Sequence, residues 1–208
     1  MKKARILLGD DHPLFAEAIQ PHLAAQYEIV GIVSDGRTLV EAAIRLKPDL
    51  ILLDISMPLL SGIEAARRIK AEVPKAKLLF FTMHSEPSYL QGAFEAGAAG
   101  YLLKSAARPE LLTAVCKVLK GQTYISSELS GHRSRLPDQG QPVKPQALTS
   151  REEEVLKLVA NGLSSKQIAS VLNVSVKTIS FHRENIKHKL GIKTIAELTR
   201  FAMSNNIA

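Results

Sequence analysis

Short apolar runs alternate with amphipathic stretches from residue 4 to residue 120, and this alternation restricts the possible folds more than any other feature. Each run has the length of a strand that is apolar on both faces, and each stretch between runs repeats apolar residues three or four positions apart. Parallel strands need crossover connections, which helices supply. The pattern predicts an α/β fold with a doubly wound five-stranded parallel sheet over residues 1–121. The apolar runs are 6–8, 29–33, 50–53, 78–81 and 101–103.

Beyond this region the composition changes twice. Residues 122–146 are rich in Ser, Gly and Pro and contain little that could be buried, so we expect a linker there, docked at its ends at most. Residues 147–208 show helical patterns throughout and predict an all-α domain of four helices. Capping boxes at Thr149–Glu152 and Ser164–Gln167 begin the first two of them.

The third of these helices is predicted over roughly residues 176–190, with Ser175 as its cap and Gly191 at its end. Two helices joined by a tight turn, the second one basic, are typical of a helix-turn-helix. The net charge of +7 supports a polyanionic partner, because it is concentrated at this end of the chain. Residues 1–120 carry +2, whereas residues 144–208 carry +5.

The composition also indicates where the protein works. The single cysteine, Cys116, excludes an internal disulfide and fits a reducing cytoplasm. No apolar stretch approaches the roughly 18 residues of a membrane span. The basic start of the chain is followed by a run that breaks at Gly9, so it does not match a signal peptide. We therefore expect a cytoplasmic protein without a membrane partner.

Polar side chains follow four of the five predicted strands. Asp10 and Asp11 follow the first, Asp54 the third, Thr82 the fourth and Lys104 the fifth. Ligands of open parallel sheets bind beyond the carboxyl ends of the strands, where these side chains should meet. Three carboxylates in close proximity favour a hard divalent cation such as Mg²⁺. The remaining hydroxyl and ammonium suit an anion with several oxygens, which indicates a phosphoryl group.

These residues resemble the receiver domain of two-component response regulators, a flavodoxin-like fold. The resemblance covers residues 3–120. It includes the motif residues Asp10-Asp11, Asp54 with Met57-Pro58 and Gly62, Thr82, and Gly100-Tyr101-Leu102-Leu103-Lys104. One departure is Ser105, which stands where many receivers have a proline after a cis bond, so the geometry of that bond stays open.

The resemblance implies a role for each site residue. Asp54 would be the nucleophile that accepts a phosphoryl group from a partner sensor histidine kinase. Mg²⁺ would be held by Asp54, by Asp11, by Asp10 at least partly through water, and by the backbone carbonyl of Ser56. Lys104 would pair with phosphate oxygens, Thr82 would move toward them, and Tyr101 would be either the inward-swinging readout or a static core ring.

Two histidines and a serine flank this predicted site. Ser56 and His84 lie two positions beyond Asp54 and Thr82, where by family analogy they flank the route of a hydrolytic water and would set the lifetime of the aspartyl phosphate. Neither His12 nor His84 has ligand spacing, so both are interpreted as bystanders to metal binding.

The C-terminal region is similar to the LuxR-type helix-turn-helix, and with the receiver it places the chain in the NarL/FixJ class. The resemblance implies binding of double-stranded promoter DNA at two short half-sites by a homodimer. Ser180, Phe181 and Glu184 are predicted to face bases, whereas Lys189 joins the lysines and arginines expected at phosphates. Glu184 either accepts from a cytosine or, as we favour, holds a neighbouring lysine. The candidate DNA-binding residues are Lys166, Lys177, Thr178, Ser180, Phe181, Arg183, Glu184, Lys187 and His188.

Two other classes of function compete with a DNA-binding regulator: an enzyme, and a receiver joined to a protein-docking module. A phosphatase of small substrates would need a second acid two residues beyond the nucleophile, where this chain has Ser56, so we expect slow hydrolysis of the chain's own aspartyl phosphate and no turnover. A dinucleotide enzyme would need a glycine-rich loop after the first strand, which is absent. A protein-docking C-terminal module is disfavoured by the +5 charge of residues 144–208.

Overall fold

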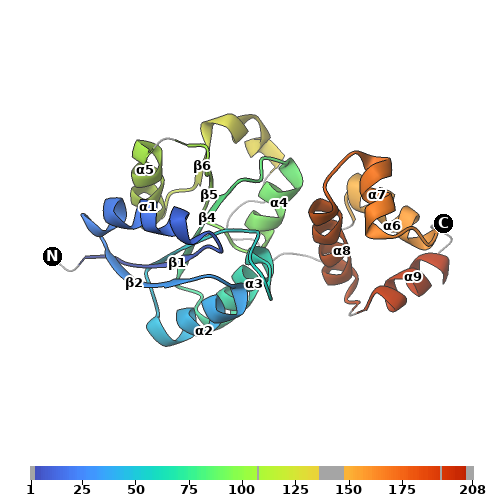
Figure 1. The fold of residues 1–208 in the computed structure, drawn as a ribbon, viewed down its shortest axis with the longest axis horizontal. Coiled ribbons are helices and arrows are strands. Elements are labelled where there is room, and N and C mark those ends of the chain that lie inside the picture. The colour runs from blue at the N-terminus through green and yellow to red at the C-terminus, as the bar shows by residue number, and fades with distance from the viewer. Residues whose placement is uncertain (1–2, 107, 136–147, 193, 205–208) are drawn as a thin grey trace. The chain divides into compact units, whose positions relative to one another are not determined.

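The computed structural model describes residues 3–106, 108–135, 148–192 and 194–204 (Figure 1). The chain divides into two compact units, Met1–Gln141 and Pro142–Ala208. Along the described chain, no helix combines the length and the apolar character that crossing a membrane requires.

The first unit contains a six-stranded parallel sheet in the order β2-β1-β3-β4-β5-β6. The doubly wound parallel architecture is confirmed, but the expected five strands are one too few. The strands are β1 (Arg5–Gly9), β2 (Glu28–Val33), β3 (Leu50–Leu53), β4 (Lys77–Thr82), β5 (Gly100–Leu103) and β6 (Tyr124–Ile125).

Helices cover both faces of this sheet, as Figure 1 shows. Buried residues of α1 and α5 pack with Ile6, Leu52 and Phe81 of the strands on one face. On the other face α2 contacts α3, and α3 contacts α4. The central strand β3 is buried along its whole length, as expected for a run that is apolar on both faces. The helices are α1 (Pro13–Ala24), α2 (Gly36–Leu46), α3 (Gly62–Glu72), α4 (Pro87–Glu95) and α5 (Arg108–Leu119).

The sixth strand and a 3-10 helix, η1 (Ser127–Arg135), occupy part of the range 122–146 that the composition assigned to a linker. Tyr124 and Ile125 pair with β5, and Leu129 is only 4% exposed. These three apolar side chains provide enough surface to hold the segment on the first unit, although its surroundings are polar. The rest of the predicted linker, residues 136–146, lies outside the described residues.

The second unit is helical in its described part, and its helix boundaries follow the capping signals. Both capping boxes are present, and Ser175 accepts a hydrogen bond from the N–H of Thr178 at 3.0 Å. Asn173 and Gly191 adopt left-handed conformations at helix ends, with φ of 51° and 68°. The helices are α6 (Ser150–Ala160), α7 (Ser165–Leu172), α8 (Val176–Leu190) and α9 (Ile195–Ser204).

Candidate functional site

The strand register brings the predicted site residues together. Gly9 is paired with Leu53, and Thr82 with Leu103, so Asp10, Asp54 and Lys104 leave their strands at one edge of the sheet. Gly62 at the start of α3 lets that helix approach the same edge, because a Cβ there would lie 1.9 Å from the carbonyl oxygen of Asp54.

Lys104 is the centre of this edge. Its Nζ lies 2.7 Å from Asp10 Oδ2 and 2.7 Å from Asp54 Oδ2, and its side chain is only 4% exposed. The ammonium also stands 4.6 Å from the centre of the Phe15 ring. The described residues contain no cis peptide bond, so the bond between Lys104 and Ser105 is trans. A buried cation thus holds two carboxylates that would otherwise repel each other.

Asp54 is 3% exposed and stays ionised despite its burial. Burial raises the pKa of the Asp54 carboxyl, but the Lys104 ammonium, the Thr82 hydroxyl and the Ser56 N–H outweigh it and hold the pKa below its ordinary value. The Ser56 N–H donates to Asp54 Oδ1 at 3.3 Å. Asp54 is therefore a carboxylate at neutral pH, which is the protonation state of a nucleophile.

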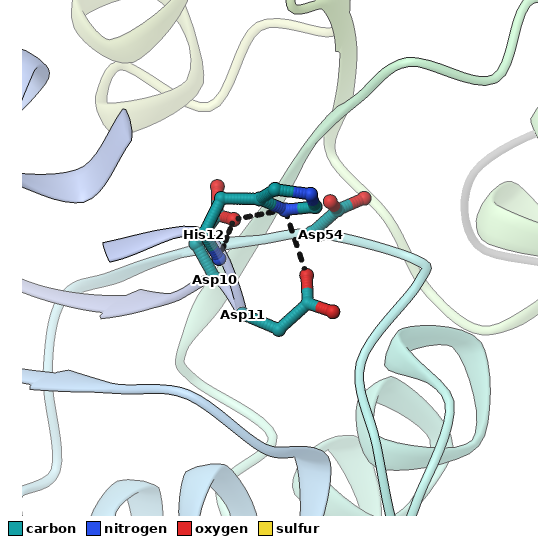
Figure 2. Close-up of side chains that lie close together, drawn as sticks. All are labelled: Asp10, Asp11, His12 and Asp54. Carbon is teal, nitrogen blue, oxygen red and sulfur yellow. Dashed lines mark hydrogen bonds and ion pairs between the residues drawn. The ribbon is translucent and has the colours of Figure 1, made fainter. Parts of the chain in front are cut away.

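Asp10, Asp11, His12 and Asp54 form a cluster in which one ligand atom of each lies within 4.8 Å of the others (Figure 2). His12 Nδ1 lies 2.9 Å from Asp11 Oδ1 and 3.3 Å from Asp10 Oδ1. His12 therefore contacts two of the predicted metal ligands, and its interpretation as a bystander to metal binding stays a prediction. The residue directly precedes α1, and only its side-chain rotamer turns the ring toward the two acids, which residue spacing does not reveal.

The donor set of this cluster fits a hard cation. Asp11 Oδ1 is buried and receives no hydrogen bond of acceptable geometry, although it stands beside the His12 ring. A buried carboxylate oxygen with free lone pairs, next to two further carboxylates, is the ligand type that Mg²⁺ prefers. The side-chain positions of Asp10, Asp11 and Asp54 are thus compatible with the predicted metal site.

Thr82, His84 and Tyr101 lie at the carboxyl ends of β4 and β5 and form a further part of the site. Thr82 and Tyr101 are fully buried, and the Tyr101 hydroxyl donates to the backbone oxygen of His84 at 2.8 Å, so its ring lies in the inward position. Burial, followed by the negative charge of Glu86, raises the pKa of Tyr101 well above its ordinary value. The His84 ring Nε2 lies 2.6 Å from Ser56 Oγ, so His84 contacts the site directly.

The second unit exposes some of the predicted DNA-binding residues on α7 and α8. Lys166, Lys177 and Ser180 are exposed, and His188 is exposed near the end of α8. Glu184 Oε1 lies 2.7 Å from Lys187 Nζ. This contact agrees with the favoured interpretation of Glu184 as the partner of a neighbouring lysine.

Other predicted DNA-binding residues are placed differently. Thr178 and Phe181 are 3% and 8% exposed, so neither side chain is presented to solvent. Thr178 is drawn in by the Ser175 cap, at 2.8 Å between the two hydroxyl oxygens, and burial of the Phe181 ring is favourable in itself. Arg183 donates to Ser165 Oγ at 2.6 Å.

Lys189, which the sequence predicts at a phosphate, forms a buried ion pair instead. Its Nζ lies 2.9 Å from Glu152 Oε2, and the two side chains are 7% and 4% exposed. Glu152 Oε2 also accepts from the N–H of Thr149 at 2.8 Å, so the capping box of α6 extends to the end of α8. Lys189 is thus engaged inside the second unit.

Comparisons with known proteins agree with both units. Residues 6–116 match the response regulator receiver domain, and residues 146–202 match the bacterial regulatory proteins of the luxR family. The transcriptional regulatory protein MctR of Rhizobium johnstonii is 36% identical over 211 residues, which cover 99% of this chain and 95% of MctR. The oxygen regulatory protein NreC of Staphylococcus aureus is 34% identical over 215 residues, which cover 98% of each protein.

Solved structures of similar architecture include the RcsB response regulator of Salmonella typhimurium. It superposes with a TM-score of 0.59 at 27% identity, over 98% of this chain and all of that one. A complex of the two-component response regulator RcsB with DNA gives a TM-score of 0.63 at 26% identity, over 98% and 99% of the two chains.

The fold, the acidic site and these matches define a response regulator. More particularly, the chain belongs to the NarL/FixJ class, in which a receiver domain is joined to a LuxR-type helix-turn-helix, and it is a transcriptional regulator of a two-component system. Members of this family are not typical turnover enzymes.

Proposed function

We propose that phosphorylation of Asp54 by a sensor histidine kinase controls the binding of this protein to promoter DNA. The observation that carries the proposal is the buried Asp54 carboxylate, which stays ionised while Lys104 lies 2.7 Å away. The site thus combines a nucleophile with a cation that can accept a new anionic partner.

In the proposed reaction an oxygen of Asp54 attacks the phosphorus of a phosphohistidine. The new bond joins phosphorus to the carboxylate oxygen, and the bond between phosphorus and the histidine nitrogen breaks, so the histidine leaves with the electron pair. Lys104 then exchanges its contact with Asp54 Oδ2 for phosphoryl oxygens, and the Thr82 hydroxyl donates to another of them. Both groups are buried, which strengthens their interaction with the transferred charge.

Mg²⁺ would be held by Asp10, Asp11, Asp54 and the backbone carbonyl of Ser56. When bound, it would neutralise charge on the phosphoryl oxygens. The chain's own contribution is to keep the acids within 4.8 Å of one another. Slow hydrolysis of the aspartyl phosphate would return the protein to its starting state. We expect Ser56 and His84 to flank the entering water, and the 2.6 Å contact between Ser56 Oγ and His84 Nε2 supports this expectation.

DNA would be bound by α7 and α8 of the second unit. Lys166, Lys177, Ser180 and His188 are exposed there, and RcsB has been solved both in complex with DNA and as two dimers bound to two parallel DNAs. We expect Lys177 to contact phosphates and Ser180 to face bases, at two half-sites occupied by a homodimer. Contacts by Thr178 or Phe181 would require these buried side chains to become accessible.

The proposal is tested by treating the full chain with a small phosphodonor and Mg²⁺. We expect one phosphoryl group by intact mass, located at Asp54 and absent from Asp54→Asn, together with tighter binding to a duplex that the treated wild type selects from a random-sequence library. Phosphorylation without any change in DNA affinity or association state would overturn the control of binding. Sustained release of phosphate from small esters would instead identify a phosphatase.

A further inference from the structure

The segment that follows α5 is fastened to β5, the strand that leads to Lys104. Tyr124 and Ile125 pair with Gly100 and Tyr101, and the Ser126 N–H donates to the backbone oxygen of Tyr101 at 2.9 Å. The Leu103 N–H in turn donates to Ser126 Oγ at 3.4 Å. Ser126 therefore holds β5 through two backbone groups, one of them directly before Lys104.

Ser126 is also the centre of a polar network beneath the surface. It is 1% exposed, and its hydroxyl donates to Glu110 Oε1 on α5 at 3.1 Å. The Tyr124 hydroxyl donates to the same oxygen at 3.0 Å. Burial and this hydrogen bond raise the pKa of Tyr124 to about 12, so the phenol remains a donor. One serine thus joins β5, α5 and the start of the segment.

The attachment continues into η1. The Ser105 hydroxyl, one residue after Lys104, lies 3.5 Å from Glu128 Oε1, and Leu129 is buried. The helix η1 contacts α4 as well as β6. Along the chain, this segment is the last described part of the first unit before the DNA-binding unit begins.

We propose that residues 124–131 are the output element of the receiver, with Ser126 as the residue through which β5 controls them. The inference rests on the proposed function, because it needs Lys104 to exchange its contact with Asp54 Oδ2 for phosphoryl oxygens. In this proposal the backbone of β5 shifts together with the Lys104 side chain, which displaces the Leu103 N–H and the Tyr101 carbonyl, both bound to Ser126. The shift weakens these bonds and loosens the segment that leads to the second unit.

The first test follows backbone hydrogen exchange in the full-length wild-type chain before and after treatment with a small phosphodonor and Mg²⁺. Loss of one hydrogen bond predicts about tenfold faster exchange at the Ser126 amide in the phosphorylated chain. The amide of Leu78 in the core strand β4 is the internal control and should not change. Unchanged or slower exchange at Ser126 in a chain that carries the phosphoryl group overturns the proposal.

The second test compares Ser126→Ala with Ser127→Ala, its exposed neighbour. The variant Ser126→Ala should accept the phosphoryl group to the same extent as wild type but lose most of the phosphorylation-dependent gain in affinity for the selected duplex. The control Ser127→Ala should keep the full gain. If Ser126→Ala keeps the full gain too, Ser126 is a packing residue and the proposal is wrong.

The outcomes separate this inference from the proposed function. A chain that takes up no phosphoryl group at Asp54 contradicts both. A chain whose DNA affinity responds to phosphorylation while exchange at Ser126 stays constant contradicts only the output element. Should Ser126→Ala not fold, which circular dichroism would show, the exchange measurement on wild type still decides the question.

Discussion

Lys104 Nζ lies 2.7 Å from Asp54 Oδ2, and both side chains are nearly inaccessible to solvent. Together with the hydrogen bonds from Thr82 and Ser56, this contact explains why a buried carboxylate stays ionised, and it defines what a phosphoryl group must displace. The same ammonium holds Asp10 at 2.7 Å, so its removal leaves two buried acids without their cation.

Replacement of Lys104 should therefore affect both stability and switching. The variant Lys104→Met should lower the free energy of unfolding by about 3 kcal/mol, the cost of leaving buried charges unpaired. Treatment with a phosphodonor should no longer raise its DNA affinity. Chemical denaturation and DNA titration measure the two effects, with Lys75→Met, an exposed lysine of the same unit, as the control. A stability equal to that of wild type would contradict the assignment of Lys104 as the central cation.

The lowered pKa of Asp54 predicts a specific dependence of stability on pH. Because the pKa in the folded state lies below the unfolded value of about 4, the ionised carboxylate stabilises the fold above that pH. This contribution is lost as the pH falls through the lowered pKa. On acidification from about pH 6 to about pH 3, the free energy of unfolding should therefore fall by more in wild type than in Asp54→Asn. A difference that stays constant over this range would contradict the lowered pKa.

The buried pair of Lys189 and Glu152 should stabilise the second unit and not bind DNA directly. The variant Lys189→Met should cost about 3–5 kcal/mol in the unfolding of this unit, because Glu152 remains buried without its partner. Thermal denaturation measures the loss, and Lys157→Met, at an exposed position of α6, is the matched control. Equal melting of both variants would show that the ion pair is not formed in solution.

Lys177 at the start of α8 should bind a DNA phosphate. The variant Lys177→Ala should weaken binding to all duplexes alike and reduce the slope of log affinity against log salt by about 1. Fluorescence anisotropy at several salt concentrations checks both, with Lys157→Ala as the control. If Lys177→Ala instead relaxes sequence preference at one base pair and keeps the salt slope, Lys177 reads a base.

Much of the fold follows from local patterns. The five apolar runs identify β1 to β5, since a buried parallel strand needs a short continuous apolar run. The capping boxes at Thr149 and Ser164 place the starts of α6 and α7, because each box satisfies the free N–H groups of a helix start. Asp10, Asp54 and Lys104 could be grouped from sequence because parallel strands end at the same edge.

The features that sequence reasoning missed depend on tertiary contacts. The strand β6 has two residues, which are too few to show any periodicity. It forms because Tyr124 and Ile125 pair with the edge of β5. The approach of His12 to the acids depends on one side-chain rotamer. Lys187 and Lys189 stand two positions apart on α8, yet one pairs with exposed Glu184 and the other with buried Glu152. Only the packing of α6 against α8 distinguishes them.

The central claim is that a phosphoryl group on Asp54 changes the affinity of the protein for DNA. The most direct measurement titrates one selected duplex with wild type and with Asp54→Asn, each before and after exposure to a small phosphodonor and Mg²⁺. We predict a higher affinity only for the treated wild type, with the added mass on Asp54. An equal gain in Asp54→Asn, or no gain in a fully phosphorylated wild type, would contradict the claim.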